Sequence, residues 1–287
     1  MHMRRLFTLV TAGAAAGLMC AGGVAGASVS PSASVSGHAM QPGGPIVRTS
    51  VPGNSGLPTI SENWSGYAAT SPKKFTFVNS TFTQPKITCP GVKNQWTSNW
   101  VGLDGFTDQT VEQDGTFAMC GGANSKTPVY TAWYELFPAG SVSVFSVKAG
   151  DKMNVSVRFA SGKFTLTVAD LTSGKKVVHT ATCTTCTRAS AEWIIERPAL
   201  CSSSTNCFLT ELADFHSATM STDEAQVSGG AVSSIAKFDN IPIDMIDPIK
   251  SGGFESLATV APLKSDAFTG TWDRTGTTTP ITLGPKI

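Results

Sequence analysis

The stretch KMNVSVRFASGKFTLTVADL, residues 152–171, alternates apolar and polar side chains on both sides of Ser161-Gly162. A period of two is the pattern of a strand with one buried face, and a two-residue turn that contains glycine joins such strands into a hairpin. A further turn is expected at residues 172–174. This stretch therefore predicts antiparallel β-structure.

Similar short runs, broken by turn residues, recur on both sides of this hairpin, and no stretch has the pattern of a long amphipathic helix. They are KFTFV (74–78), STFTQP (80–85), SNWVGLD (98–104), VYTAWYELFP (129–138), VSVFSV (142–147), KKVVHTAT (175–182) and a last strand around Phe268 to Trp272. About a dozen strands within residues 58–287 predict a single all-β domain. We expect an antiparallel two-sheet β-sandwich of the concanavalin or jelly-roll type.

The first 27 residues resemble a secretory signal peptide: Arg4 and Arg5 precede an apolar run that ends in the small residues 25–27. Residues 28–57 are rich in Ser, Pro and Gly, as in a linker or a short prosegment. No later stretch approaches the roughly 18 apolar residues of a membrane span. We therefore expect a secreted, extracellular protein, with the mature chain beginning near Ser28 and no membrane partner.

The charge balance excludes polyanionic partners. The chain has 21 Lys and Arg against 20 Asp and Glu, so loss of Arg4 and Arg5 leaves 19 − 20 = −1. Nucleic acid and anionic membranes are not expected to bind such a protein. With only 14% charged residues, the fold should depend little on ionised carboxylates, so acid should remove little stability.

The six cysteines outside the signal segment predict three disulfides in an oxidising compartment, with about 15 possible connectivities. Only Cys201–Cys207 is singled out by its short loop. The full set is Cys89, Cys120, Cys183, Cys186, Cys201 and Cys207. His179, Cys183 and Cys186 could instead supply three zinc ligands, but an oxidising compartment favours the disulfide. We expect no metal and no cofactor.

Common hydrolase motifs are absent from the sequence, which contains no HExxH, GxSxG, Walker loop, DTG or DSG. A serine triad would need His179 or His216, and Asp214 lies beside the latter. No serine has the context of a nucleophile elbow, so this reading is not favoured.

In ASAEWIIERP, residues 189–198, strand alternation puts Glu192 and Glu196 on one face and directs Trp193 and Ile195 into the core. Four residues at about 3.3 Å each separate the two glutamate Cα atoms by about 13 Å. A glycosidase pair needs about 5 to 9.5 Å between carboxyl groups. Glu196 therefore requires a partner from another strand.

Two other segments also place tryptophan and acidic side chains on one face. Alternation puts Trp100 and Asp104 together in residues 98–104, and Trp133 and Glu135 together in residues 129–138. Exposed tryptophans are costly on an ordinary solvated face, so a groove that binds an extended polymer is indicated.

Five blocks carry a resemblance to a known family: NWSGY (63–67), WVGLDG (100–105), TVEQDGT (110–116), AWYELFP (132–138) and AEWIIERP (191–198). In order and spacing they resemble the signature blocks of the glutamic peptidases, the eqolisin family. The resemblance implies a β-sandwich whose concave face is the substrate cleft, with a Gln–Glu dyad that maps onto Gln113 and Glu196.

The resemblance also assigns the neighbouring positions: Trp100, Asp104, Trp133 and Glu135 line or support the cleft, and Glu192 is a neighbour of the dyad. Phe117 and Thr131 replace acidic residues of the family pattern.

The implied activity is that of a monomeric acid endopeptidase acting on polypeptides, with Glu196 as general base and acid and Gln113 as oxyanion donor. Two alternatives remain open. One is a carbohydrate-binding, lectin-like sandwich that stacks sugars on Trp100 and Trp133. The other is a glycosidase that uses Glu135 with Glu192 or Glu196.

Overall fold

The computed structural model describes residues 39–41, 59–203, 206–249 and 251–281, all within one compact unit, residues 32–287. The predicted signal segment, residues 1–27, lies outside the described residues, as does most of the predicted linker. Within that linker, Ala39–Gln41 forms strand β1, which pairs with β13, Ala199–Ser203.

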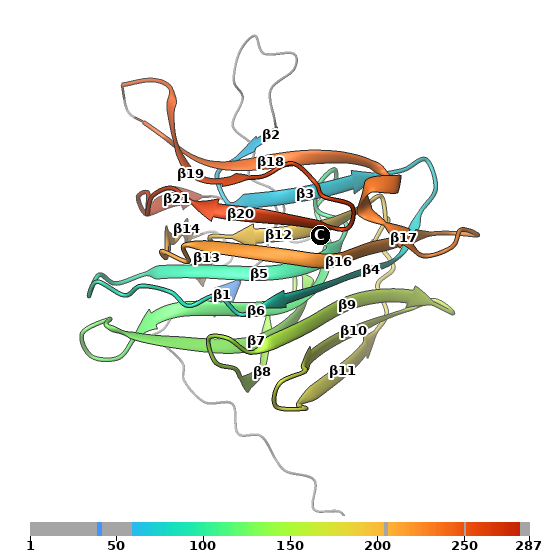
Figure 1. The fold of residues 1–287 in the computed structure, drawn as a ribbon, viewed down its shortest axis with the longest axis horizontal. Helices are drawn as coiled ribbons and strands as arrows, with labels where there is room; N and C mark the ends of the chain where they lie inside the picture. Colours follow the sequence, from blue (N-terminus) through green and yellow to red (C-terminus); the bar gives the residue numbers. More distant parts are fainter. Residues whose placement is uncertain (1–38, 42–58, 204–205, 250, 282–287) are drawn as a thin grey trace, which may run out of the picture. The chain divides into compact units, whose positions relative to one another are not determined.

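The regular secondary structure of the described residues is all β-strand (Figure 1) apart from one short 3₁₀ turn, η1, Ile235–Lys237. The other strands are β2 Thr59–Ser61, β3 Trp64–Thr70, β4 Phe75–Thr83, β5 Gln95–Leu103, β6 Val111–Gly121, β7 Thr127–Phe137, β8 Val142–Ser146, β9 Lys152–Ala160, β10 Lys163–Asp170, β11 Lys176–Ala181, β12 Ser190–Glu196, β14 Asn206–Leu209, β15 Glu211–Leu212, β16 Ser217–Val227, β17 Ser233–Ser234, β18 Asp239–Pro248, β19 Phe254–Val260, β20 Ala267–Trp272 and β21 Thr279–Ile281. Within the described ranges, no helix has the length and apolar character needed to cross a membrane.

The predicted hairpin is confirmed as β9 and β10, which pair around Ser161 and Gly162. Both turn residues have positive φ, 51° and 77°, as a two-residue hairpin turn with the twist of its strands requires. The runs 74–78 and 80–85 mostly fall in one strand, β4, because Asn79, the residue between them, continues the strand. The strand predicted around Phe268 to Trp272 is β20.

One large sheet folds back on itself to form the two layers of the predicted sandwich (Figure 1). One layer has the order β8-β7-β6-β5-β12-β3-β18. Strand β19 pairs with both β18 and β20, and the second layer continues as β20-β16-β4-β9-β10-β11. These pairings are all antiparallel, which confirms the predicted fold class.

The core between the layers is apolar and takes side chains from both. Trp193 of β12 is fully buried there, as alternation predicts, and Val155 and Leu166 come from the opposite layer. The indole Nε1 of Trp193 donates to the Asn79 carbonyl oxygen at 2.8 Å, so its polar atom is also paired. This anchor fixes which face of β12 is turned away from the core.

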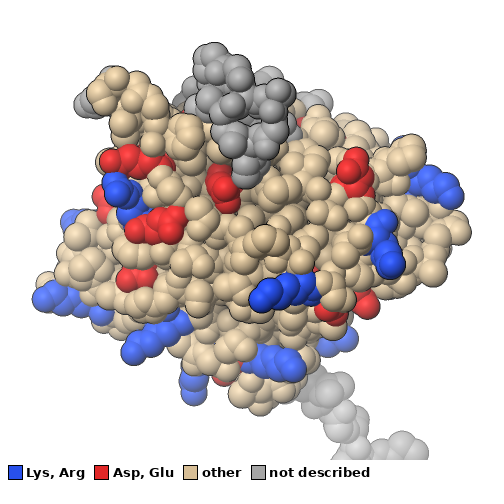
Figure 2. Space-filling view, turned by 45° about the horizontal axis from the view of Figure 1, so that its top comes forward, with Lys and Arg blue, Asp and Glu red and all other residues tan. Residues whose placement is uncertain are grey.

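A second, four-stranded sheet has the order β1-β13-β14-β21. The predicted Cys201–Cys207 disulfide joins β13 to β14 at directly opposed positions. Figure 2 shows charged side chains scattered over one face with wide uncharged areas between them, in line with the low charged fraction.

Candidate active site

Glu196, the last residue of β12, is 1% exposed and is held by two donors from other parts of the chain. Its Oε2 accepts a 2.8 Å hydrogen bond from Trp100 Nε1, and its Oε1 accepts a 3.4 Å bond from Asn63 Nδ2. Hydrogen bonds to a carboxylate are stronger than those between neutral groups. The carboxylate is thus fixed in orientation on the face opposite Trp193.

Asn63 was not predicted as a site residue, and Ser61 orients it. The Ser61 hydroxyl donates to Asn63 Oδ1 at 2.9 Å and accepts from the backbone nitrogens of Asn63 and Trp64 at 3.2 and 3.0 Å. Because the amide oxygen is engaged, Nδ2 is directed to Glu196. The local signal was a serine two residues before an asparagine, which is typical of a side-chain-capped turn.

Gln113 on β6 lies directly opposite Glu135 on β7, and Gln113 Nε2 donates to Glu135 Oε2 at 2.9 Å. Burial raises the pKa of Glu135 well above its usual value; the charge of Glu196 raises it further, and the Gln113 bond lowers it. The influence of Glu196 means that the two carboxyl groups lie close enough to interact. Three strands thus bring Gln113, Glu135 and Glu196 together.

Tryptophans fill the space between these polar groups. Trp100 lies opposite Gly115, which in turn lies opposite Trp133. A Cβ at Gly115 would come within 2.2 Å of the Asn99 carbonyl oxygen and 2.6 Å of Trp100 Cβ, so only glycine fits. Trp64 packs edge-on against Trp100 with ring centroids 5.0 Å apart.

These tryptophan rings are fully buried rather than exposed in an open groove. Trp64, Trp100 and Trp133 are each 0% exposed and belong to one apolar cluster, which includes Leu200 of the four-stranded sheet. A platform that stacks sugars needs an accessible ring face, so this arrangement gives no support to the lectin-like alternative. A substrate can reach the face that carries Trp100 and Trp133 only if the residues that bury these rings move away.

The two departures from the family pattern lie on this same face. Phe117 and Thr131 are directly opposed, and Phe117 is also opposite Ser98, the residue that faces Glu196. Phe117 packs against Trp96 with ring centroids 5.5 Å apart. Apolar packing therefore replaces acidic side chains at this point.

Glu192 belongs to a different acidic group from Glu196. It is fully buried, and burial raises its pKa well above the usual value. The charges of Asp104, Asp108 and Glu112 raise the pKa further, whereas the Ser190 hydroxyl lowers it. The structure thus separates the two glutamates of this strand, as their spacing predicts.

Asp104 does not follow the alternation expected from the sequence. Strand β5 ends at residue 103, and Asp104 has a φ of 73°, which turns its side chain away from the face of Trp100. Its carboxylate accepts hydrogen bonds from Thr187 Oγ1 at 2.8 Å and from the backbone nitrogens of Arg188 and Ala189 at 2.7 and 2.6 Å. Asp104 therefore holds the segment that leads into β12.

The six predicted disulfide cysteines form three bonds: Cys89–Cys120, Cys183–Cys186 and Cys201–Cys207. His179 stacks on the Tyr134 ring at 4.2 Å between centroids, and the residue that gathers with the 183–186 pair is Glu112 instead.

His216 contacts Asp214 at 3.2 Å and Thr88 Oγ1 at 3.2 Å. The hydroxyl beside this histidine therefore belongs to a threonine, and the serine-triad alternative gains no support.

The chain resembles solved peptidase structures in fold. A crystal structure of scytalido-glutamic peptidase with a transition state analog inhibitor matches with a TM-score of 0.62 and 23% identity, over 74% of this chain and 98% of that one. SCP-B, an Eqolisin family member solved with the tripeptide Ala-Ile-His, gives 0.60 and 23% over the same shares. Aspergilloglutamic peptidase from Aspergillus niger gives 0.50 and 27%, over 62% of this chain and 99% of that one.

Among curated proteins, no significant match to the sequence was found. The sequence model described as the Peptidase A4 family matches residues 62–271, which is most of the chain and includes every residue of the Gln113–Glu135–Glu196 group. The glutamic-peptidase resemblance is therefore confirmed at the level of family and fold. This chain is a peptidase that belongs to the Peptidase A4 family.

Proposed function

We propose that this peptidase is a secreted acid endopeptidase in which Glu196 and Gln113 carry out the chemistry. The observation that carries the proposal is the convergence of Glu196, Gln113 and Glu135 from three strands on one face. The Trp100 and Asn63 hydrogen bonds supply the fixed orientation that a general base needs.

In the proposed mechanism, the Glu196 carboxylate takes a proton from a water molecule, which attacks the scissile carbonyl carbon. The carboxyl group then delivers that proton to the leaving amine. Gln113 donates through its side-chain amide to the developing oxyanion, and an amide does not titrate, so this donor persists in acid. Glu135 fixes the rotation of the Gln113 amide through the 2.9 Å bond.

Acid activity follows from the nature of the base and of its neighbours. A free glutamate has a pKa near 4.3, so a glutamate base works at lower pH than a histidine does. Burial raises the pKa of Glu135 well above its usual value, and the charge of Glu196 raises it further, which favours the neutral carboxyl in acid. It therefore adds no second negative charge where the oxyanion forms.

We propose that residues 1–27 direct secretion and that residues 28–57 act as a prosegment of the domain at 58–287. The support is the signal-like sequence, three disulfides and the pairing of β1 with β13, whose Leu200 packs in the tryptophan cluster. N-terminal sequencing of the secreted protein before and after acid incubation tests this. Retention of residues 28–57 in the active enzyme would contradict it.

The experiment for the activity compares hydrolysis of an unfolded protein and of polysaccharides from about pH 2 to about pH 8, with a chelator and an aspartic-peptidase inhibitor present. Glu196→Gln and Gln113→Ala should abolish proteolysis while the circular dichroism spectrum of the folded protein is retained. The matched controls, Glu224→Gln and Gln226→Ala, make the same chemical changes on β16 in the other layer and should retain activity. A Glu196→Gln protein that still digests the unfolded substrate in acid refutes the assignment.

A further inference from the structure

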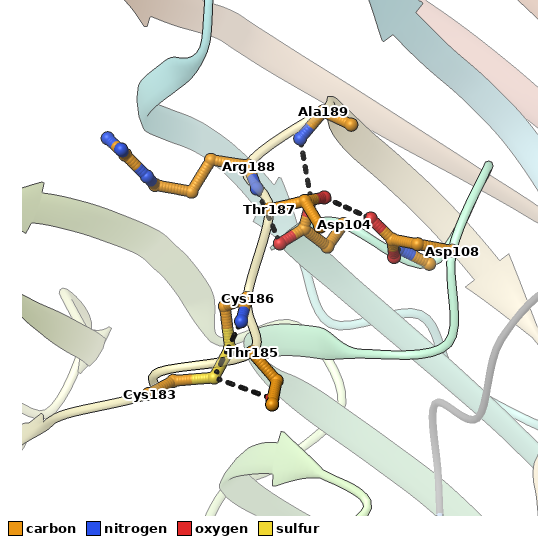
Figure 3. Close-up of a disulfide and its surroundings, with 9 residues drawn as sticks. Asp104, Asp108, Cys183, Thr185, Cys186, Thr187, Arg188 and Ala189 are labelled. Atoms are coloured by element: carbon orange, nitrogen blue, oxygen red, sulfur yellow. Dashed lines mark hydrogen bonds between the residues drawn. A yellow bond between two sulfur atoms is a disulfide. The ribbon is translucent and has the colours of Figure 1, made fainter. Parts of the chain in front are cut away.

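The segment between β11 and β12, residues 182–189, is bound to the turn that follows β5. Thr187 Oγ1 lies within hydrogen-bond distance of carboxyl oxygens of both Asp104 and Asp108. The backbone nitrogens of Arg188 and Ala189 donate to Asp104 (Figure 3). The Cys183–Cys186 disulfide lies at the start of this segment, so its position relative to the acidic turn is fixed.

The surroundings of Cys183 would favour a sulfur anion. The Cys186 backbone nitrogen donates to Cys183 Sγ at 3.1 Å, and Thr185 Oγ1 lies 3.6 Å from the same atom (Figure 3). Hydrogen bonds to a thiolate stabilise its charged form. Cys-x-x-Cys is also the ligand spacing of zinc-binding loops. Once the bond between them is reduced, these two sulfurs have the sequence spacing of two zinc ligands from one loop.

Glu112 on β6 completes the group. It is 0% exposed, and among the described residues the side-chain group close enough to interact with its carboxyl by a hydrogen bond is the carboxyl of Asp104. One of these oxygens and the two Sγ atoms all lie within 4.8 Å of one another. In a tetrahedral zinc site, with bonds of about 2.3 Å to sulfur and about 2.0 Å to oxygen, neighbouring ligand atoms are about 3.3 to 3.8 Å apart. Shifts on the order of 1 Å would bring these three into that geometry.

The local charge also favours a cation. The charges of Asp104 and Asp108 lie close enough to raise the pKa of Glu112, and the positive charge of Arg188 lowers it. The Arg188 guanidinium, however, packs 3.8 Å over the Phe159 ring and points away from both aspartates (Figure 3). Carboxyl groups therefore outnumber basic groups around the three ligand atoms, which favours a bound cation.

We propose that, once its disulfide is reduced, the group Cys183, Cys186 and Glu112 binds one thiophilic divalent cation of the zinc class. A dithiol reductant supplies two electrons and two protons: the S–S bond breaks, two thiols form, and the reductant becomes a disulfide. The cation then displaces the two thiol protons and the proton of the buried Glu112 carboxyl to solvent, and binds two sulfurs and one carboxylate oxygen, with water in the fourth position. Disulfide and metal are thus alternative cross-links of the same loop, and this inference is independent of the peptidase mechanism.

Selective reduction is feasible because this disulfide is the most accessible of the three. Cys183 and Cys186 are both partly exposed, whereas each of the other bonds has at least one buried cysteine: Cys201 and Cys207 are 3% and 2% exposed, and Cys120, the partner of the partly exposed Cys89, is 7% exposed. A reductant should therefore reach the 183–186 pair first.

The test uses the full-length protein, reduced with a limiting phosphine, desalted without oxygen at neutral pH and titrated with Co²⁺. We expect two reactive thiols and one bound cobalt per chain, with thiolate-to-cobalt charge-transfer absorption and the strong visible bands of a tetrahedral site. Added Zn²⁺ should abolish both. The unreduced protein and the double variant Cys183→Ser/Cys186→Ser should show neither.

The variant Glu112→Gln distinguishes a site with three protein ligands from one in which the two thiols bind the metal by themselves. This variant keeps the shape and burial of the side chain, and it should weaken Zn²⁺ binding, measured by competition with a chromogenic chelator, by about 10- to 100-fold. Glu224→Gln on β16 is the matched control and should bind as the parent does. Unchanged affinity in Glu112→Gln, or reduced parent protein without charge-transfer absorption, would overturn the proposal.

Discussion

Replacing Asp247 with alanine should destabilise this protein far more than breaking a surface ion pair. Arg197, the residue after Glu196, is 0% exposed, and its Nη2 lies 3.1 Å from Asp247 Oδ1. The guanidinium also donates to the carbonyl oxygens of Glu62 at 2.5 Å and Thr277 at 2.9 Å. Asp247 Oδ2 accepts from the Thr277 backbone nitrogen at 2.7 Å. The ion pair thus joins the end of β12 to β18 and to the chain before β21.

The expected magnitude follows from the burial of both partners. Removal of one member of a buried pair leaves an uncompensated charge and costs about 3 to 5 kcal/mol. In a domain of this size, 1 kcal/mol corresponds to about 2 to 4 °C, so the melting temperature should fall by about 6 to 20 °C. The Arg274–Glu255 pair is the matched comparison, because its side chains are 53% and 43% exposed. Breaking it should cost no more than about 1 kcal/mol.

The assay is thermal unfolding, followed by circular dichroism, of the parent, Asp247→Ala, Asp247→Asn and Glu255→Gln. Asp247→Asn keeps an acceptor and loses the charge, so it should unfold between the parent and Asp247→Ala. The reasoning fails if Asp247→Ala melts within the range of Glu255→Gln.

Three further changes test the packing, the buried acids and the candidate site. Gly115→Ala adds a Cβ 2.2 Å from the Asn99 oxygen and should lower the free energy of unfolding, measured in urea, by about 1 to 3 kcal/mol. An unchanged free energy of unfolding would contradict the close packing. Burial raises the pKa of Asp114 well above its usual value, so the folded protein keeps this carboxyl protonated where the unfolded chain, with a pKa near 3.9, has ionised it. The stability that this proton contributes is fully present below the unfolded pKa and is lost as the pH rises through the folded pKa. The melting temperature of Asp114→Asn should therefore fall less than that of the parent between about pH 4 and about pH 7. An equal fall in both proteins would assign the pH dependence to other groups. Glu135→Ala removes the bond that orients Gln113, worth about 1 kcal/mol, and should lower kcat about fivefold in steady-state proteolysis with little change in KM; an unchanged kcat would exclude the orienting role.

Much of the fold could be predicted from local sequence because strand alternation and turn chemistry are local. The 152–171 hairpin, the burial of Trp193 and the shared face of Glu192 and Glu196 all follow from counting residues in twos. The blocks of the family resemblance added Gln113 as the proposed partner. Alternation failed at Asp104, where one residue with positive φ ends the strand.

The sequence by itself determined the class of fold, the family and, apart from Asp104, the faces of the strands that carry the candidate site. Only the tertiary structure decided which groups meet, such as Asn63 with Glu196 at a separation of 133 residues, and how the four cysteines other than Cys201 and Cys207 pair. It also decided that the two glutamates of one strand belong to two different acidic groups. The physical reason is that side-chain direction depends on nearest neighbours along the chain. A contact across strands depends on pairing register and on how the layers close, and no short stretch encodes either.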